Sequence, residues 1–203
     1  MTILSVNKTR EFDVRIALIF LFCGCGLRPF FYFEVIMRKN IRFLTHAGII
    51  AATYVVLTYL QYMLFPQTVS GMVQFRASES LMVLAFFTPA AVPGLTVGCL
   101  LFNITSSAVL PLDFLVGSLA TLLAAEGMRL TRRATVFGYP LPGMLMPALT
   151  NAVLVGWELS VYVGGGFWLN AVYVALGELA VLLTLGSVLY FALRSRRLDK
   201  RLF

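Results

Sequence analysis

The chain consists of long apolar blocks separated by short polar or proline- and glycine-rich breaks. The longer blocks hold about 18–24 residues, the helix length needed to cross a hydrocarbon core of about 30 Å. Sixty per cent of the 203 residues are hydrophobic and only 12% are charged, whereas soluble domains carry roughly 25% charged residues. A water-soluble fold would lack polar surface, so the sequence predicts an all-α integral membrane protein embedded in a lipid bilayer.

Prolines, glycines and charged residues divide the region after residue 40 into six predicted transmembrane helices. The second is short, and the pairs Thr88-Pro89 and Pro93-Gly94 are predicted to form the turn that follows it. The first predicted span runs from 41 to 65, and the second runs from the end of the 67–80 loop to 87. The third follows the turn and ends at about 110, and the fourth runs from the 111–113 turn to about 128. The fifth and sixth run from 141 to 163 and from 168 to 193.

Basic residues cluster between these spans. With six spans counted from Ile41, 11 of the 12 Lys and Arg residues after position 37 share one side of the membrane, and Arg76 alone lies opposite. Because cytoplasmic loops are enriched in Lys and Arg, this distribution predicts that both the N- and C-termini are cytoplasmic. The formal charge of +7 is then explained by topology, and no nucleic-acid partner is expected.

Residues 1–36 do not fit the six-span arrangement. The stretch from Ile16 to Ile36 is apolar, yet it contains Arg28, Pro29 and Glu34, and a seventh span would place the N-terminus outside. No small-residue cleavage site of a secretory signal follows its apolar run. We therefore expect 1–36 to be an upstream extension, with translation starting at Met37, or else a disordered segment, and 37–203 to form the six-helix membrane domain.

The sequence holds no motif for ATP hydrolysis or metal binding. No glycine-rich phosphate loop ending in Gly-Lys-Ser/Thr is present, so energy for any active process must come from a partner or a gradient. His46 is the only histidine, which argues against a histidine metal site and a Ser-His-Asp triad. We expect no catalytic residues, no metal and no cofactor.

Polar residues inside the apolar blocks are the best candidates for a binding site, because an ionisable group in hydrocarbon is costly and usually faces a partner or a cavity. Glu79 begins the second helix. Asn151 and Glu158 are seven residues apart on one face of the fifth span, and Asn170 and Glu178 share a face of the sixth. These residues predict a polar site toward the outer side of the membrane. For Glu158 and Glu178, a structural role such as an interhelical hydrogen bond is the alternative.

Two further patterns allow more than one interpretation. Trp157, near Trp168 and Tyr173, could stack on a planar ligand or belong to an interfacial aromatic belt. Ala47 and Ala51 are small residues four apart, which permits close approach of another helix. That helix could lie within this chain or in a separate membrane subunit.

The stretches Gln74-Phe75-Arg76-Ala77-Ser78-Glu79 and Phe87-Thr88-Pro89-Ala90-Ala91-Val92-Pro93-Gly94-Leu95-Thr96-Val97-Gly98-Cys99 resemble the QueT-type substrate-binding components of energy-coupling factor (ECF) transporters, which are associated with uptake of queuosine precursors. The resemblance covers roughly Met37 to the C-terminus. It implies a six-helix S component in a bacterial cell membrane, working with a transmembrane coupling protein and two ATPase subunits.

The resemblance also implies a substrate and a docking motif. The substrate would be 7-aminomethyl-7-deazaguanine or a related deazapurine, for which the carboxylates, the amides and an aromatic wall are suitable partners. Arg76 could pair with Glu79, bind the base carbonyl or simply mark the loop. Ala47 and Ala51 are similar to the small-residue motif that contacts the coupling protein.

Three other functions are compatible with an apolar chain of this kind. An S component for another vitamin, such as riboflavin or thiamine, would share the fold. A stand-alone secondary transporter would need its own ion site and often shows a repeat between its halves, which the sequence lacks. A small membrane-bound transferase would need a base and nucleophile pair, and none is evident.

The late start at Met37 is directly testable. Protein expressed from its own upstream sequence should begin at Met37 when its N-terminal peptides are determined by mass spectrometry. Peptides from residues 1–36 would contradict this expectation.

Overall fold

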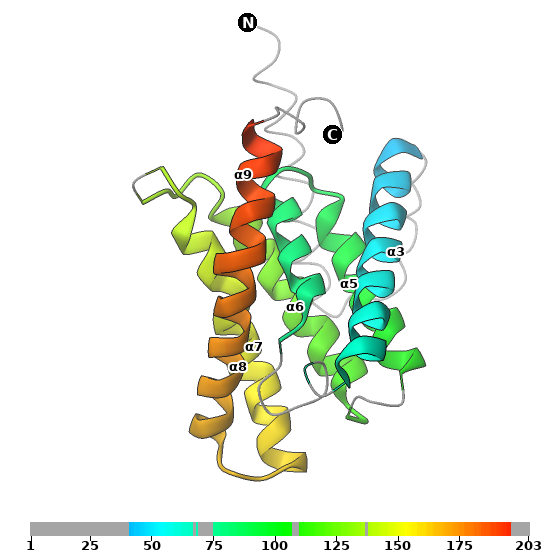
Figure 1. Ribbon diagram of the computed structural model, residues 1–203, viewed down its shortest axis with the longest axis vertical. Coiled ribbons are helices and arrows are strands. Elements are labelled where there is room, and N and C mark those ends of the chain that lie inside the picture. Colours follow the sequence, from blue (N-terminus) through cyan, green and yellow to red (C-terminus); the bar gives the residue numbers. More distant parts are fainter. Residues whose placement is uncertain (1–40, 67, 69–74, 107–109, 137, 196–203) are drawn as a thin grey trace, which may run out of the picture. The chain divides into compact units, whose positions relative to one another are not determined.

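The computed structural model describes residues 41–66, 68, 75–106, 110–136 and 138–195, and this part of the chain is almost wholly helical (Figure 1). The predicted all-α fold is therefore confirmed, whereas the predicted extension 1–36 lies outside the described residues. The elements are α3 (Ile41–Leu64), η1 (Ala77–Phe86), α5 (Ala91–Thr105), α6 (Asp113–Leu130), α7 (Leu141–Tyr162), α8 (Phe167–Val181), η2 (Leu182–Gly186) and α9 (Ser187–Ser195).

Six helical stretches result, because α8, the π-helical turn η2 and α9 form one continuous helix. Of the described helices, α3, α7 and α8–η2–α9 are long and apolar enough to cross a membrane. The 3-10 helix η1 has 10 residues and α5 has 15. With rises of about 2.0 and 1.5 Å per residue, each of these two is about 20 Å long.

Successive helices run in opposite directions (Figure 1), so the connections gather at two ends of the compact unit formed by Thr45–Phe203. The connections α3–η1, α5–α6 and α7–α8 lie at one end, which we call the polar end. The η1–α5 and α6–α7 connections and the end of α9 lie at the other, which we call the basic end. Its described residues include Arg129, Arg132, Arg133 and Arg194.

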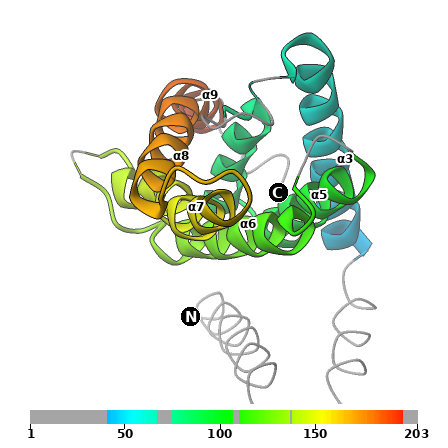
Figure 2. The same ribbon diagram turned by 90° about the horizontal axis from the view of Figure 1, so that it is seen from below.

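The helices from α5 to α8 follow one another in a row, as Figure 2 shows, because each packs on the next in the sequence. The short helix η1 packs against α5, α6, α8, η2 and α9. Met82, Val83 and Ala85 of η1 have at most 1% of their surface exposed. η1 is therefore a central element, and the position of its first turn decides where its polar residues lie.

The structure corrects the predicted turn before α5. Pro93-Gly94 is helical rather than part of the turn, because α5 already begins at Ala91. Pro93 is tolerated in the first turn of a helix, where the backbone N–H has no intrahelical acceptor to lose. The turn is confined to residues 87–90, and Gly94 has a packing role instead.

Close packing of α3 on α5 depends on small residues of both helices. A Cβ atom on Gly94 would lie 2.7 Å from the carbonyl oxygen of Ala47, and one on Gly98 would lie 3.0 Å from that of Ala51. Ala47 and Ala51 are themselves buried. The structure thus places both alanines in a contact within the chain, the first of the two alternatives, and their contact with a coupling protein stays a prediction.

Gly98→Ala should destabilise the protein because the new methyl group would meet Ala51 backbone atoms and the Tyr54 Cβ at 2.9–3.2 Å, which only a separation of α3 from α5 can relieve. Overpacking of this kind costs about 1–3 kcal/mol. Thermal unfolding in detergent should therefore begin several degrees lower. Gly48→Ala is the matched control, because nothing lies within 4 Å of its added Cβ. Equal unfolding temperatures for the two variants would contradict this packing.

Candidate functional site

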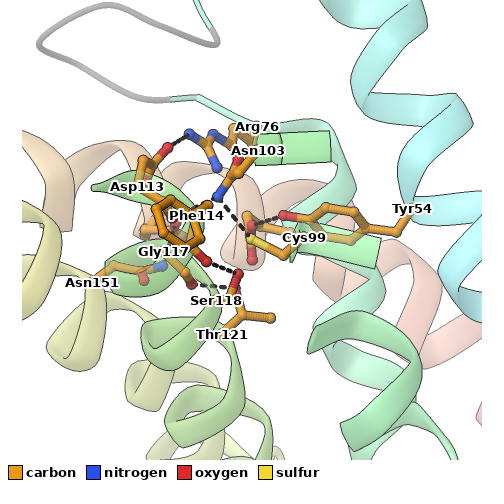
Figure 3. Close-up of polar contacts among 12 residues, drawn as sticks. Tyr54, Arg76, Cys99, Asn103, Asp113, Phe114, Gly117, Ser118, Thr121 and Asn151 are labelled. Atoms are coloured by element: carbon orange, nitrogen blue, oxygen red, sulfur yellow. Dashed lines mark hydrogen bonds and ion pairs between the residues drawn. The ribbon is translucent and has the colours of Figure 1, made fainter. Parts of the chain in front are cut away.

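A buried ion pair joins two connections at the polar end. Arg76 precedes η1 and Asp113 begins α6. Their Nη2 and Oδ2 atoms are 3.1 Å apart, and the two side chains are only 7% and 5% exposed (Figure 3). Burial works against the charge of Arg76, but the summed attraction of Asp113 and neighbouring acidic groups raises its pKa above the ordinary value. Arg76 therefore stays charged within the site.

Asn103 and Gly117 hold Asp113 in position. The Nδ2 atom of Asn103 donates to the backbone oxygen of Asp113 at 2.9 Å. Gly117 lies one helical turn after Asp113, and a Cβ atom there would be 2.5 Å from Asp113 Oδ1 and 2.9 Å from Asn103 Nδ2. Because Gly117 has no side chain, the Asp113 carboxylate and the Asn103 amide can lie against the backbone of α6 at this point (Figure 3).

Helix α3 fixes the start of η1 through two side chains. The side-chain oxygen of Gln61 accepts a hydrogen bond from the backbone N–H of Ala77 at 2.7 Å, and its amide group donates to the Phe75 carbonyl. One helical repeat earlier, the Tyr54 hydroxyl donates to Glu79 Oε1 at 2.5 Å. Tyr54 is fully buried and Glu79 is 2% exposed, so η1 presents its first-turn carboxylate to the interior.

The second part of the site comes from α7 and α8. Asn151 donates through Nδ2 to Glu178 Oε1 at 2.7 Å, which joins the middle of α7 to the last turn of α8. At their connecting turn, Gly164, Gly165 and Gly166 all have φ between 82° and 86°, a region that favours glycine. This turn directs the Gly164 carbonyl to the amide of Asn170 at 2.7 Å.

Glu158 belongs to the same cluster. It lies on α7, one helical repeat after Asn151, and is 1% exposed. It interacts electrostatically with Asp113 and Arg76, while Glu178 interacts with Glu79 and Arg76. The charged groups at η1 and α6 and the glutamates of α7 and α8 are therefore close enough to form one electrostatic site.

The cluster contains polar atoms that the described part of the chain leaves without a hydrogen-bond partner. Nine buried side-chain atoms are in this state, and seven of them are carboxylate or amide oxygens. Buried polar groups are normally hydrogen-bonded, so this concentration makes the cluster the candidate binding site. The nine atoms are Arg76 Nε, Ser78 Oγ, Glu79 Oε2, Asn103 Oδ1, Asp113 Oδ1, both Glu158 Oε atoms, Asn170 Oδ1 and Glu178 Oε2.

Most of the polar residues singled out in the sequence are buried. Arg76, Glu79, Asn151, Glu158, Asn170 and Glu178 are all at most 6% exposed. Trp157 differs, because it is 50% exposed although its neighbour Glu158 is buried. Trp168 is 80% exposed. Their positions favour the interfacial aromatic belt over a wall of the site.

Sequence reasoning missed three members of the site. Tyr54 and Asn103 lie inside apolar blocks, and Asp113 lies at a predicted turn. The signal for Asn103 was its polar amide within an apolar span, whereas no local pattern distinguishes Tyr54 from an ordinary core tyrosine. Within the described residues, no group of three His, Cys, Asp or Glu side chains is arranged to hold a metal ion. The side chains of the cluster are suited to hydrogen bonding and charge pairing.

Comparison with known proteins supports a transport function for this membrane bundle. The model of the QueT transporter family matches residues 44–195, a range that includes every member of the polar site. No curated protein and no solved structure matches the chain. The resemblance noted in the sequence is confirmed over most of the chain's length, and the protein belongs to the QueT transporter family.

Proposed function

We propose that the protein is the substrate-binding component of an ECF-type importer for a queuosine precursor, 7-aminomethyl-7-deazaguanine or a related deazapurine. It would take up its substrate across a bacterial plasma membrane as a multi-pass subunit. A transmembrane coupling protein and two ATPase subunits would supply the energy. The observation that carries this proposal is the set of unpaired acceptor atoms at the polar end.

The unpaired atoms favour a ligand that is rich in hydrogen-bond donors. Seven of the nine are carboxylate or amide oxygens, which accept, whereas only Arg76 Nε is a pure donor. An aminomethyl deazaguanine carries N–H groups on its rings, on its exocyclic amine and on its ammonium group, and these outnumber its acceptors. Arg76 would then be available to the base carbonyl.

The charges favour a cation. Glu79, Asp113, Glu158 and Glu178 are buried in one cluster with a single described cation, Arg76. A buried charge is tolerated when it is paired. An ammonium group placed between the unpaired carboxylate oxygens would supply the missing positive charge, and charge-assisted hydrogen bonds of this type are the stronger ones.

The distribution of basic residues supports capture from outside. Four of the five Lys and Arg residues described between Thr45 and Ser195 lie at the basic end. By the positive-inside rule this side would be cytoplasmic, together with both termini. The polar end would then face outward, where a substrate arrives. The four residues are Arg129, Arg132, Arg133 and Arg194.

Docking on the coupling protein is proposed for the face of α3 that carries Ala47 and Ala51. Because both residues pack on α5 in this chain, docking there would require α3 to move relative to α5. Gly94 and Gly98 place no long side chains in that contact, but the hydrogen bonds of Tyr54 and Gln61 to η1 would have to break.

Purified protein without partner subunits should bind an aminomethyl deazaguanine tightly and with one-to-one stoichiometry. Isothermal titration calorimetry in detergent with a panel of deazapurines, purines, riboflavin and thiamine would measure this. The aminomethyl compound should bind best because it supplies both the donors and the cation. Preferred binding of a vitamin would move the assignment to another substrate, and no binding of any of these compounds would overturn it.

Gly117→Ala should weaken binding of the aminomethyl deazaguanine at least tenfold, since the new methyl group would displace the Asp113 carboxylate and the Asn103 amide. Gly127→Ala is the control on the same helix, because its Cβ would meet only the flexible side chain of Met146 at 3.2–3.3 Å. Both variants should unfold at similar temperatures. Equal affinities of the two variants would exclude Asp113 and Asn103 from substrate binding.

A further inference from the structure

The polar end has an excess of buried acids over bases. Every helix that contributes to it supplies a titratable group: Tyr54 from α3, Arg76 and Glu79 at η1, Cys99 from α5, Asp113 from α6, Glu158 from α7 and Glu178 from α8. Residues 67–74 and 107–109, which belong to the connections at this end, contain no ionisable side chain. Four carboxyl groups are therefore set against one guanidinium group.

This excess cannot be carried as ionised carboxylates while the site is empty. A charge removed from water and left unpaired is neutralised by a change of protonation rather than kept. Arg76 is paired with Asp113 at 3.1 Å, so its charge is already balanced. The remaining three carboxyl groups have no second buried cation in the described part of the chain, and some of them must hold a proton.

Of the three remaining carboxyl groups, that of Glu158 has the fewest hydrogen bonds to stabilise a negative charge. Glu79 accepts a hydrogen bond from Tyr54, and Glu178 accepts one from Asn151. Neither oxygen of Glu158 has a partner, although the residue is 1% exposed. The proton is therefore held most readily on Glu158.

We propose that Glu158 is protonated in the empty site and gives up its proton when the ammonium group of the substrate binds beside it. The O–H bond of the carboxyl group breaks, the proton passes to the solvent, and the carboxylate pairs with the ammonium group, which keeps all its own protons. This inference rests on the proposed function, since it requires a cationic substrate at this site. Substrate capture is then an exchange of one cation for another, and the net charge of the buried cluster is unchanged.

The exchange predicts the direction of the pH dependence. Protons compete with the substrate for Glu158, so affinity should fall as the pH is lowered and should rise as the pH is raised until Glu158 is ionised in the empty site. Release of one proton limits the slope to about tenfold in affinity per pH unit. The substrate amine does not contribute, because an alkylamine stays protonated from about pH 5 to pH 8.

Calorimetry in buffers with different ionisation enthalpies measures the proton directly. The wild-type protein should release about one proton on binding 7-aminomethyl-7-deazaguanine at low pH, where Glu158 is fully protonated, and close to none on binding the neutral 7-hydroxymethyl analogue. Binding of the amine without proton release at every pH would overturn the exchange and leave the proposed function intact. Failure of both compounds to bind would instead count against the proposed function.

A matched pair of variants assigns the proton to its residue. Glu158→Gln keeps the size of the side chain but has no proton to exchange, so proton release and pH dependence should disappear, and the amine should lose more affinity than the hydroxymethyl analogue. Glu126→Gln, near the basic end of α6, should behave as the wild type does. Undiminished proton release in Glu158→Gln would overturn the assignment to Glu158.

Discussion

The cost of burying carboxylates among apolar helices is the constraint around which the polar end is built. Three side chains reduce this cost by bonding to a carboxylate: the Tyr54 hydroxyl, the Arg76 guanidinium and the Asn151 amide. These partners satisfy only one oxygen of most carboxyl groups. The remaining oxygens are held in place without a hydrogen-bond partner. This is a preorganised arrangement for a ligand with many hydrogen-bond donors.

Small residues make this arrangement possible. Gly94 and Gly98 bring α3 close enough to α5 for Tyr54 to reach Glu79, and Gly117 makes room for the Asp113 carboxylate. In a bilayer, where apolar burial between helices provides little driving force, close packing of this kind and interhelical hydrogen bonds hold the bundle together. The packing of the bundle and the geometry of the site therefore depend on the same contacts.

An exchange of a proton for an ammonium group would let one site be both stable when empty and attractive to a cation. A cluster that kept all four carboxylates ionised would bind a cation strongly but would destabilise the empty bundle. A cluster with only neutral polar groups would be stable but would not distinguish an amine from its neutral analogue. Glu158, buried and without a partner, can satisfy both requirements because its charge can follow that of the ligand.

Local and one-dimensional properties were determined by the sequence by itself: the apolar blocks, the six helices, the clustering of basic residues, and the helix faces shared by Asn151 with Glu158 and Asn170 with Glu178. These follow from helical periodicity and the apolar composition. Only the tertiary structure decided that Pro93-Gly94 is helical, that Ala47 and Ala51 face α5, and that Arg76 pairs with Asp113, 37 residues away. Such contacts depend on which helix faces meet, and the sequence of one helix does not determine which face of another helix packs against it.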